Sequence, residues 1–86
     1  MRKIRFWQEA WDDYQEWANT DIKIYRKIAK LIADIQEQQT SEGLGKPEPL
    51  KHDYQGCWSR RITQEHRLVY KVTENEIIII SCKYHY

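Results

Sequence analysis

The chain has 86 residues, of which 41% are hydrophobic and 31% charged, with only 3 glycines and 2 prolines. This composition predicts a single folded domain over residues 1–86 and excludes a low-complexity, disordered chain. The longest aliphatic run, at residues 77–80, is far shorter than the ~20 residues that cross a bilayer. Acidic and polar residues follow the basic start at once, so we expect no secretory signal, no membrane contact and a cytoplasmic protein.

The net charge of +1 conceals a separation of charge along the chain. Residues 8–42 carry eight acidic and four basic side chains, whereas the remaining residues carry ten basic and five acidic ones. The charge is therefore segregated between an early acidic part and the rest of the molecule, which is basic.

The first half predicts a short strand over residues 4–7 followed by two helices. Apolar residues at spacings of four, three and four predict the buried face of the first helix: Trp7, Trp11, Tyr14 and Ala18. The N-cap formers at residues 19–21 separate this helix from a second one that runs to about Gln38. The second helix carries its own apolar stripe: Ile24, Ile28, Leu31, Ile32 and Ile35. The two stripes need a common surface, and a sheet can supply it.

The second half predicts that sheet. Residues 40–49 hold both prolines and two glycines and are predicted to form a loop. Three strands separated by short polar turns follow at residues 57–63, 66–72 and 76–84. The predicted class is α+β, with a two-helix hairpin packed on a twisted antiparallel sheet in the order strand-helix-helix-strand-strand-strand. The run at 77–80 does not alternate, which is typical of a strand buried on both faces.

Alternation along the strands divides their side chains between two faces. In the strand at 66–72 the face predicted to meet the helices comprises Leu68, Tyr70 and Val72, and the open face comprises Arg67, Val69 and Lys71. In the preceding strand Trp58 and Ile62 point inward, which leaves Arg61 on the same open face as Arg67. Cys57 and Cys82 lie on strands about 9–10 Å apart, so no disulfide is expected, and so few cysteines indicate a reducing compartment.

The polar residues of the second half include a carboxylate, an imidazole and several cations: Lys46, Glu48, Lys51, Arg61, Arg67, His85 and Tyr86. Metal-free cleavage of RNA needs a base for the 2′-hydroxyl, cations for the phosphorane and an acid for the leaving 5′-oxygen. Glu48 is the candidate base, Arg61 and Arg67 are the candidate clamp, and His85 is the candidate acid. No cofactor is expected.

Each of these residues also has an ordinary interpretation. Glu48 could be a solvated loop residue, although Pro47 and Pro49 stiffen the backbone around it. The two arginines could pair with nearby carboxylates, Glu65 or Glu76. His85 could be a frayed terminal residue.

Other candidates are weaker. His52 and His66 are interpreted as loop and as strand or turn residues, and a zinc site at Cys82 and His85 is rejected because no second ligand pair exists. The tryptophans at 7, 11 and 58 are predicted to lie in the core. Tyr54 and Tyr86 are the better candidates for stacking on bases.

Several motifs in order closely resemble the YoeB/Txe family of the RelE-like superfamily. They are Gly-Lys-Pro-Glu-Pro-Leu-Lys-His at 45–52, Trp-Ser-Arg-Arg-Ile-Thr at 58–63, Glu-His-Arg-Leu-Val-Tyr at 65–70 and Tyr-His-Tyr at 84–86. Trp-Asp-Asp-Tyr at 11–14, Trp17 and Thr-Asp at 20–21 resemble the family as well. The resemblance implies a RelE-like fold and a toxin of a type II toxin–antitoxin pair. Such a toxin would cut mRNA in the ribosomal A site and be neutralised by a YefM/Axe-type antitoxin.

The resemblance also assigns roles to residues of this sequence. It implies that Glu48 is the general base, His85 the general acid and Arg67 the phosphate-stabilising residue, supported by Lys51, Arg61 and Tyr86. Only Cys57 departs from expectation, because an apolar or aromatic residue is expected there. The basic part suits the 70S ribosome and mRNA, with the acidic helical side facing away, and a homodimer is plausible.

Two other functions remain open. A catalytically silent module could block translation by occupying the ribosome, or bind the antitoxin, through the same basic face. A DNA-binding regulator is poorly supported, because no helix carries a basic recognition face.

Overall fold

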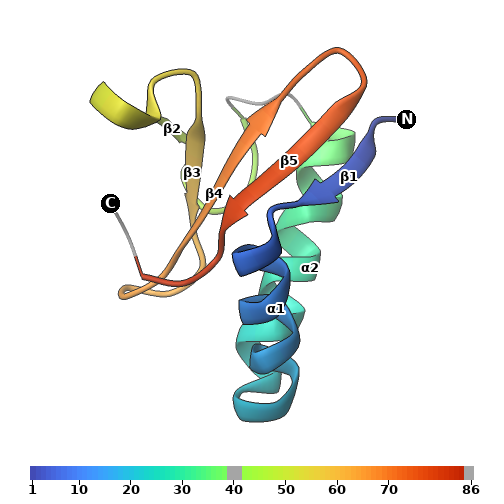
Figure 1. The fold of residues 1–86 in the computed structure, drawn as a ribbon, viewed down its shortest axis with the longest axis vertical. Helices are drawn as coiled ribbons and strands as arrows, with labels where there is room; N and C mark the ends of the chain where they lie inside the picture. Colours follow the sequence, from blue (N-terminus) through green and yellow to red (C-terminus); the bar gives the residue numbers. More distant parts are fainter. Residues whose placement is uncertain (39–41, 85–86) are drawn as a thin grey trace.

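The computed structural model describes residues 1–38 and 42–84 (Figure 1). Its elements, in chain order, are β1 (Lys3–Phe6), α1 (Gln8–Thr20), α2 (Ile22–Glu37), β2 (Glu48–Pro49), the 3₁₀ turn η1 (His52–Tyr54), β3 (Trp58–Arg61), β4 (Arg67–Val72) and β5 (Glu76–Ser81). The predicted helices and the three predicted main strands are all present, with the strands shorter at their ends than predicted. Within the described residues, no helix combines the length and the apolar character needed to cross a membrane.

The sheet has five strands in the order β1-β5-β4-β3-β2. β3, β4 and β5 form the predicted antiparallel meander, so the α+β class is confirmed. The prediction of a purely antiparallel sheet is wrong, because β1 pairs with β5 in parallel after the helical hairpin carries the chain across one face. β2 was also missed, since it lies in the predicted loop. Pro49 has no N–H to donate, which restricts this strand to a short segment at the sheet edge.

The hairpin of α1 and α2 covers one face of the sheet (Figure 1). Asp21 is the N-cap of α2, and its carboxylate accepts hydrogen bonds from the backbone N–H groups of Lys23 and Ile24, at 3.1 and 3.3 Å. The helix ends at Glu37, close to the predicted end. Its predicted stripe is confirmed by the buried residues Ile28, Leu31, Ile32 and Ile35.

The predicted buried face of α1 is confirmed at Tyr14 and wrong at its other members. The side chains that pack into the core are Ala10, Tyr14 and Trp17. Trp7 precedes the helix as its N-cap and is 53% exposed, Trp11 is 43% exposed, and Ala18 is exposed. Aromatic residues recur on two neighbouring faces of this helix, and packing on α2 and β5 selects the face that begins at Ala10.

The second face of the sheet is less open than predicted. A small apolar cluster lies there, formed by Cys57, Val69, Ile78 and Ile80, with Leu50 and Tyr54 packed against it. Cys82 instead belongs to the core under the helices, so the two free cysteines lie on opposite faces. All four isoleucines at 77–80 are buried, as the lack of alternation predicted.

Candidate active site

Arg61 and Arg67 stand directly opposite each other across β3 and β4. Opposed residues of an antiparallel pair project from the same face, so the predicted convergence of these two arginines is present. Like charges in this position destabilise a sheet, and a bound anion would remove the repulsion. Arg61 is exposed and Arg67 half-buried.

The Arg67 guanidinium is held by main-chain oxygens. Its Nη1 donates to the carbonyls of Thr63, Gln64 and His66 at 2.6, 3.1 and 3.1 Å. The alternative pairing with Glu76 is absent, because the Glu76 carboxylate instead lies 3.2 Å from Arg5 Nε. Within residues 1–38 and 42–84, neither Arg61 nor Arg67 forms an ion pair.

Glu48 reaches the same face through β2. It pairs with Ser59 of β3, two residues before Arg61, and alternation then places Glu48 and Arg61 on one side of the sheet. Gly45 sets this approach: its carbonyl accepts the Arg61 N–H at 2.7 Å, and its φ is +81°. A Cβ at Gly45 would lie 3.0 Å from the Arg61 carbonyl and from a Leu31 methyl, so the close approach requires glycine.

The two candidate lysines flank this segment. Lys46 has a left-handed φ of 52° and Lys51 is the residue before η1; both are exposed. Tyr54, a candidate for base stacking, is half-buried against the small apolar cluster on the face of the sheet away from the helices. The structure therefore carries Lys46, Glu48 and Lys51 on one continuous edge segment beside β3.

The turn after β5 returns to Arg67. The backbone N–H of Arg67 donates to the Tyr84 carbonyl at 2.8 Å, and the Tyr84 N–H donates to His66 Nδ1 at 2.8 Å. The predictions for His85 and Tyr86 lie outside the described residues. The last described residue is thus hydrogen-bonded to the residue predicted to bind phosphate.

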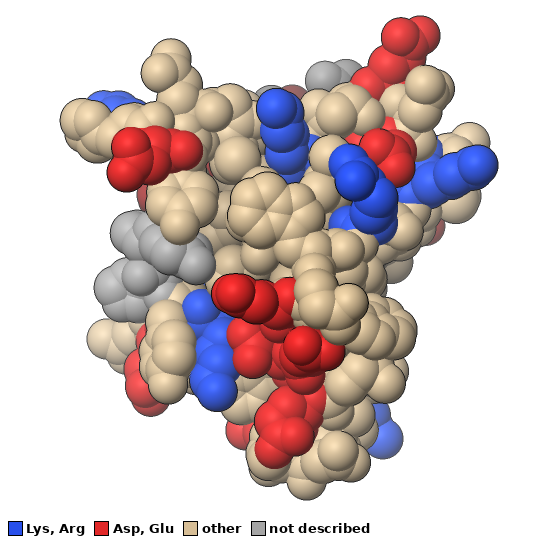
Figure 2. Space-filling model, in the orientation of Figure 1, with Lys and Arg blue, Asp and Glu red and all other residues tan. Residues whose placement is uncertain are grey.

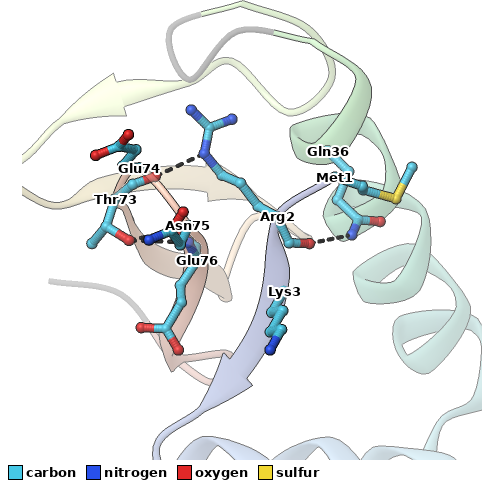
Figure 3. Close-up of a pocket in the computed structure, with 8 residues that line it drawn as sticks. All are labelled: Met1, Arg2, Lys3, Gln36, Thr73, Glu74, Asn75 and Glu76. Atoms are coloured by element: carbon cyan, nitrogen blue, oxygen red, sulfur yellow. Dashed lines mark hydrogen bonds between the residues drawn. The ribbon is translucent and has the colours of Figure 1, made fainter.

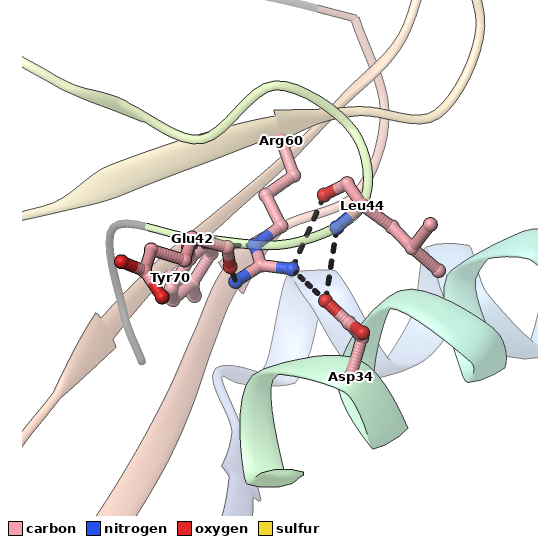
Figure 4. Close-up of polar contacts among 5 residues, drawn as sticks. All are labelled: Asp34, Glu42, Leu44, Arg60 and Tyr70. Atoms are coloured by element: carbon pink, nitrogen blue, oxygen red, sulfur yellow. Dashed lines mark hydrogen bonds and ion pairs between the residues drawn. The ribbon is translucent and has the colours of Figure 1, made fainter. Parts of the chain in front are cut away.

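Sequence reasoning missed two residues that shape this region, Arg60 and His66. The Arg60 side chain is fully buried on the helix side (Figure 4). Its guanidinium donates to Asp34 Oδ2 (2.6 Å), the Glu42 and Leu44 carbonyls (2.6 and 3.1 Å) and the Tyr70 hydroxyl (2.9 Å). Alternation with Trp58 and Ile62 could have identified Arg60 as inward-facing. No comparable pattern marked His66.

Burial and pairing in this cluster oppose each other in their effects on pKa. Burial tends to raise the pKa of Asp34, but the Leu44 N–H and the Arg60 guanidinium outweigh it and hold the pKa below its ordinary value. Burial raises the pKa of Tyr70, and the neighbouring Arg60 only reduces that rise. The cluster therefore holds an ionised Asp34 against a permanent cation and fixes the segment that leads into Gly45 and Glu48.

Charge is distributed between layers as well as along the chain. Acidic side chains gather over α1 in Figure 2, and this helix contributes Glu9, Asp12, Asp13 and Glu16. Arg61 and Arg67 lie on the other side of the sheet from the helices. An anionic ligand approaching these arginines therefore meets the face away from α1.

A cavity of about 790 Å³ lies at the other end of β4 (Figure 3). It lies between the start of β1 and the turn from β4 to β5, and its lining groups bond to each other: Arg2 Nε donates to the Thr73 carbonyl at 2.7 Å, and Gln36 Nε2 to the Arg2 carbonyl at 3.1 Å. It contains none of the predicted site residues.

In the described part of the chain, no cluster of three or more His, Cys, Asp or Glu side chains could hold a metal ion.

Comparison with known proteins defines the class to which this chain belongs. A family model described as "YoeB-like toxin of bacterial type II toxin-antitoxin system" matches residues 6–86. Toxin YoeB of Escherichia coli (strain K12) is 54% identical over 84 residues, which cover 98% of this chain and 99% of the relative. The chain therefore belongs to the YoeB-like toxin family, as the resemblance predicted.

Solved structures agree with this assignment. A chain of the YoeB-YefM complex from Staphylococcus aureus aligns with a TM-score of 0.92 and 45% identity, covering 100% of this chain and 99% of that chain. A YoeB dimer from the same organism aligns with a TM-score of 0.93 and 47% identity, covering 99% and 98%. The predicted fold class is thus the fold of these toxins.

Proposed function

We propose that this toxin is a ribosome-dependent mRNA endoribonuclease that needs no metal ion for catalysis. It would cut the messenger in the A site and so stop translation in the cytoplasm. The observation that carries the proposal is the placement of Glu48, Arg61 and Arg67 on one face of the sheet, with Tyr84 hydrogen-bonded to Arg67.

The reaction follows from the proton and charge requirements of RNA. Glu48 accepts the proton of the ribose 2′-hydroxyl, and the 2′-oxygen forms a bond to the adjacent phosphorus. Arg67 and Arg61 stabilise the negative charge of the phosphorane oxygens. The bond from phosphorus to the 5′-oxygen then breaks as His85 protonates that oxygen, which leaves a 2′,3′-cyclic phosphate and a 5′-hydroxyl. DNA lacks the nucleophile and is not cut.

The remaining candidates bind rather than react. Lys46 and Lys51 would hold the RNA backbone on either side of Glu48, and Tyr86 would contact the substrate beside His85. The main-chain bonds to Arg67 support its role, because a guanidinium already held in place needs little reorganisation when charge develops.

Mapping 5′ ends on a defined messenger in a reconstituted translation mixture, with and without 70S ribosomes, tests the proposal. The wild type should cut within the A-site codon only when ribosomes are present. Glu48→Gln and His85→Gln should each lower the cleavage rate by ~10²–10⁴-fold, the usual contribution of a general acid or base. Glu74→Gln, an exposed glutamate in the turn before β5, is the matched control and should cut like the wild type.

A non-catalytic module is the second candidate, because the opposed arginines favour any bound anion, whether or not it reacts. An intact messenger with arrested translation in the wild type and both variants would support that function and contradict cleavage.

We further propose that a YefM-type antitoxin and a second copy of this chain are binding partners. The YoeB-YefM complex and the YoeB dimer of the Staphylococcus aureus relatives support both. An acidic antitoxin segment would suit the face that carries Arg61 and Arg67. Sedimentation of the chain with and without the antitoxin tests these assemblies.

A further inference from the structure

The turn that follows β5 is fixed from two directions. Trp17 of α1 donates its Nε1–H to the Cys82 carbonyl at 3.0 Å. His66 Nδ1 accepts the Tyr84 N–H, and the Arg67 N–H donates to the Tyr84 carbonyl, both at 2.8 Å. Both polar groups of the Tyr84 peptide backbone are therefore engaged by two consecutive residues.

The turn needs such support because Tyr84 has a φ of +60°, in the left-handed region that a non-glycine side chain disfavours. A conformation of this kind persists where surrounding contacts determine it. The Lys83 ammonium adds two such contacts, at 5.8 Å from the centre of the Trp17 ring and 5.5 Å from that of Tyr84.

The His66 ring is itself held in place. Its residue is 9% exposed, and Trp17 packs edge-on against the ring, with centroids 4.9 Å apart at an interplanar angle of 69°. In this hydrogen bond Nδ1 is the acceptor, because the Tyr84 amide can only donate. The His66 N–H also bonds to Thr63 Oγ1 at 3.2 Å, which fixes the backbone just before β4.

We propose that His66, oriented by Trp17, is a positioning residue for RNA cleavage. Its Nδ1 holds the backbone N–H of Tyr84, the residue covalently bonded to His85, while the Arg67 N–H holds the Tyr84 carbonyl. The inference rests on the proposed function of His85 as the general acid. Small displacements of a reacting group can cost ~10²-fold in rate, so a hydrogen bond one residue away can control the chemical step.

Two substitutions separate the acceptor from the ring. His66→Phe keeps a ring against Trp17 but removes the acceptor, whereas His66→Asn loses the ring but keeps an oxygen as many bonds from Cα as Nδ1. The measurements are the single-turnover cleavage rate on saturating ribosome–mRNA complexes, the affinity for those complexes, and hydrogen exchange of the Tyr84 amide. We expect His66→Phe to lower the rate about 10- to 100-fold with unchanged affinity and to expose the amide. His66→Asn should restore most of the rate and of the protection.

Trp17→Phe provides a second test should a His66 variant fail to fold. It removes the donor to Cys82 and keeps an aromatic ring, and Trp11→Phe on the exposed part of the same helix is its control. Trp17→Phe should lower the rate more than Trp11→Phe does.

Three results would overturn the inference: a His66→Phe rate equal to the wild type, equal losses in His66→Phe and His66→Asn, or a loss of affinity in place of rate. A wild type that binds ribosomes without cutting would instead overturn the proposed function, and the inference with it.

Discussion

Arg60 and Arg61 are consecutive residues of β3, yet they belong to regions with opposite properties. Arg60 is buried under the helices, where Asp34, Tyr70 and two carbonyls occupy its donors. Arg61 lies on the other face, exposed and opposite a second cation, Arg67. Arg60 thus finds its counterion within the chain, whereas Arg61 has no ion-pair partner among residues 1–38 and 42–84. The face of the strand, and not the residue type, decides which role an arginine takes.

The largest effect should be on the free energy of unfolding, when the buried charge of Arg60 is removed. Arg60→Met leaves Asp34 without its cation and should lower the free energy of unfolding by about 3–5 kcal/mol, measured by urea denaturation. Adding Asp34→Leu should recover much of that loss, because an apolar pair of similar volume often replaces a buried ion pair without cost. A loss below ~1 kcal/mol in the single variant would contradict the structural role of Arg60.

The same substitution one residue later should act on function instead. Arg61→Met changes an exposed side chain, so the free energy of unfolding should stay within ~0.5 kcal/mol of the wild type. The cleavage rate on ribosome–mRNA complexes should fall about 10- to 100-fold, as expected for a lost hydrogen bond to a charged group. If Arg61→Met cleaved at the wild-type rate while Arg60→Met was destabilised, Arg61 would not belong to the active site.

A smaller effect is expected on the salt dependence of ribosome binding. Binding to ribosomes should weaken as salt rises, because phosphate contacts release counterions. Arg61→Met should reduce the slope of log affinity against log salt by about 0.7–1, the contribution of one phosphate contact. A flat response in the wild type would exclude a phosphate-binding role for this face.

The smallest effect at neutral pH concerns the groups buried on the helix side. Burial raises the pKa of Tyr14 from 10.0 to about 12, and the pKa of Cys82 from 9.0 to about 12. The folded chain keeps these protons while the unfolded chain loses them, so the contribution of these two groups to stability should fall as pH rises from about 9 to 12. Tyr14→Phe should make urea midpoints fall less steeply over this range; an unchanged slope would contradict the raised pKa of Tyr14.

The sequence predicted those parts of the fold that depend on local pattern. The stripe and N-cap of α2 and the three strands of the meander follow from spacing and turn residues alone. The parallel pairing of β1 with β5 depends on where the helical hairpin delivers the chain, which no local window contains. In α1 two neighbouring faces were apolar enough to be buried, and tertiary packing chose Ala10 over Trp11.

The candidate site was likewise predictable only where its residues follow a local pattern. Alternation placed Arg61 beside Arg67, and the same rule, applied once more, would have placed Arg60 inside. His66 was different, because its partner is the peptide of Tyr84, which arrives through a turn with positive φ after β5. The function of His66 depends on that return of the chain.

The position of β5 has a consequence for the order in which the molecule folds. It is the last described strand along the chain, yet it lies between β1 and β4 in the sheet (Figure 1). The helical hairpin and the meander can each form from neighbouring segments, whereas the pair of Lys3 and Glu76 closes a loop over most of the chain. We therefore expect β1 to dock late and to limit the folding rate, and a chain that stops before Glu76 to leave β1 without a neighbour.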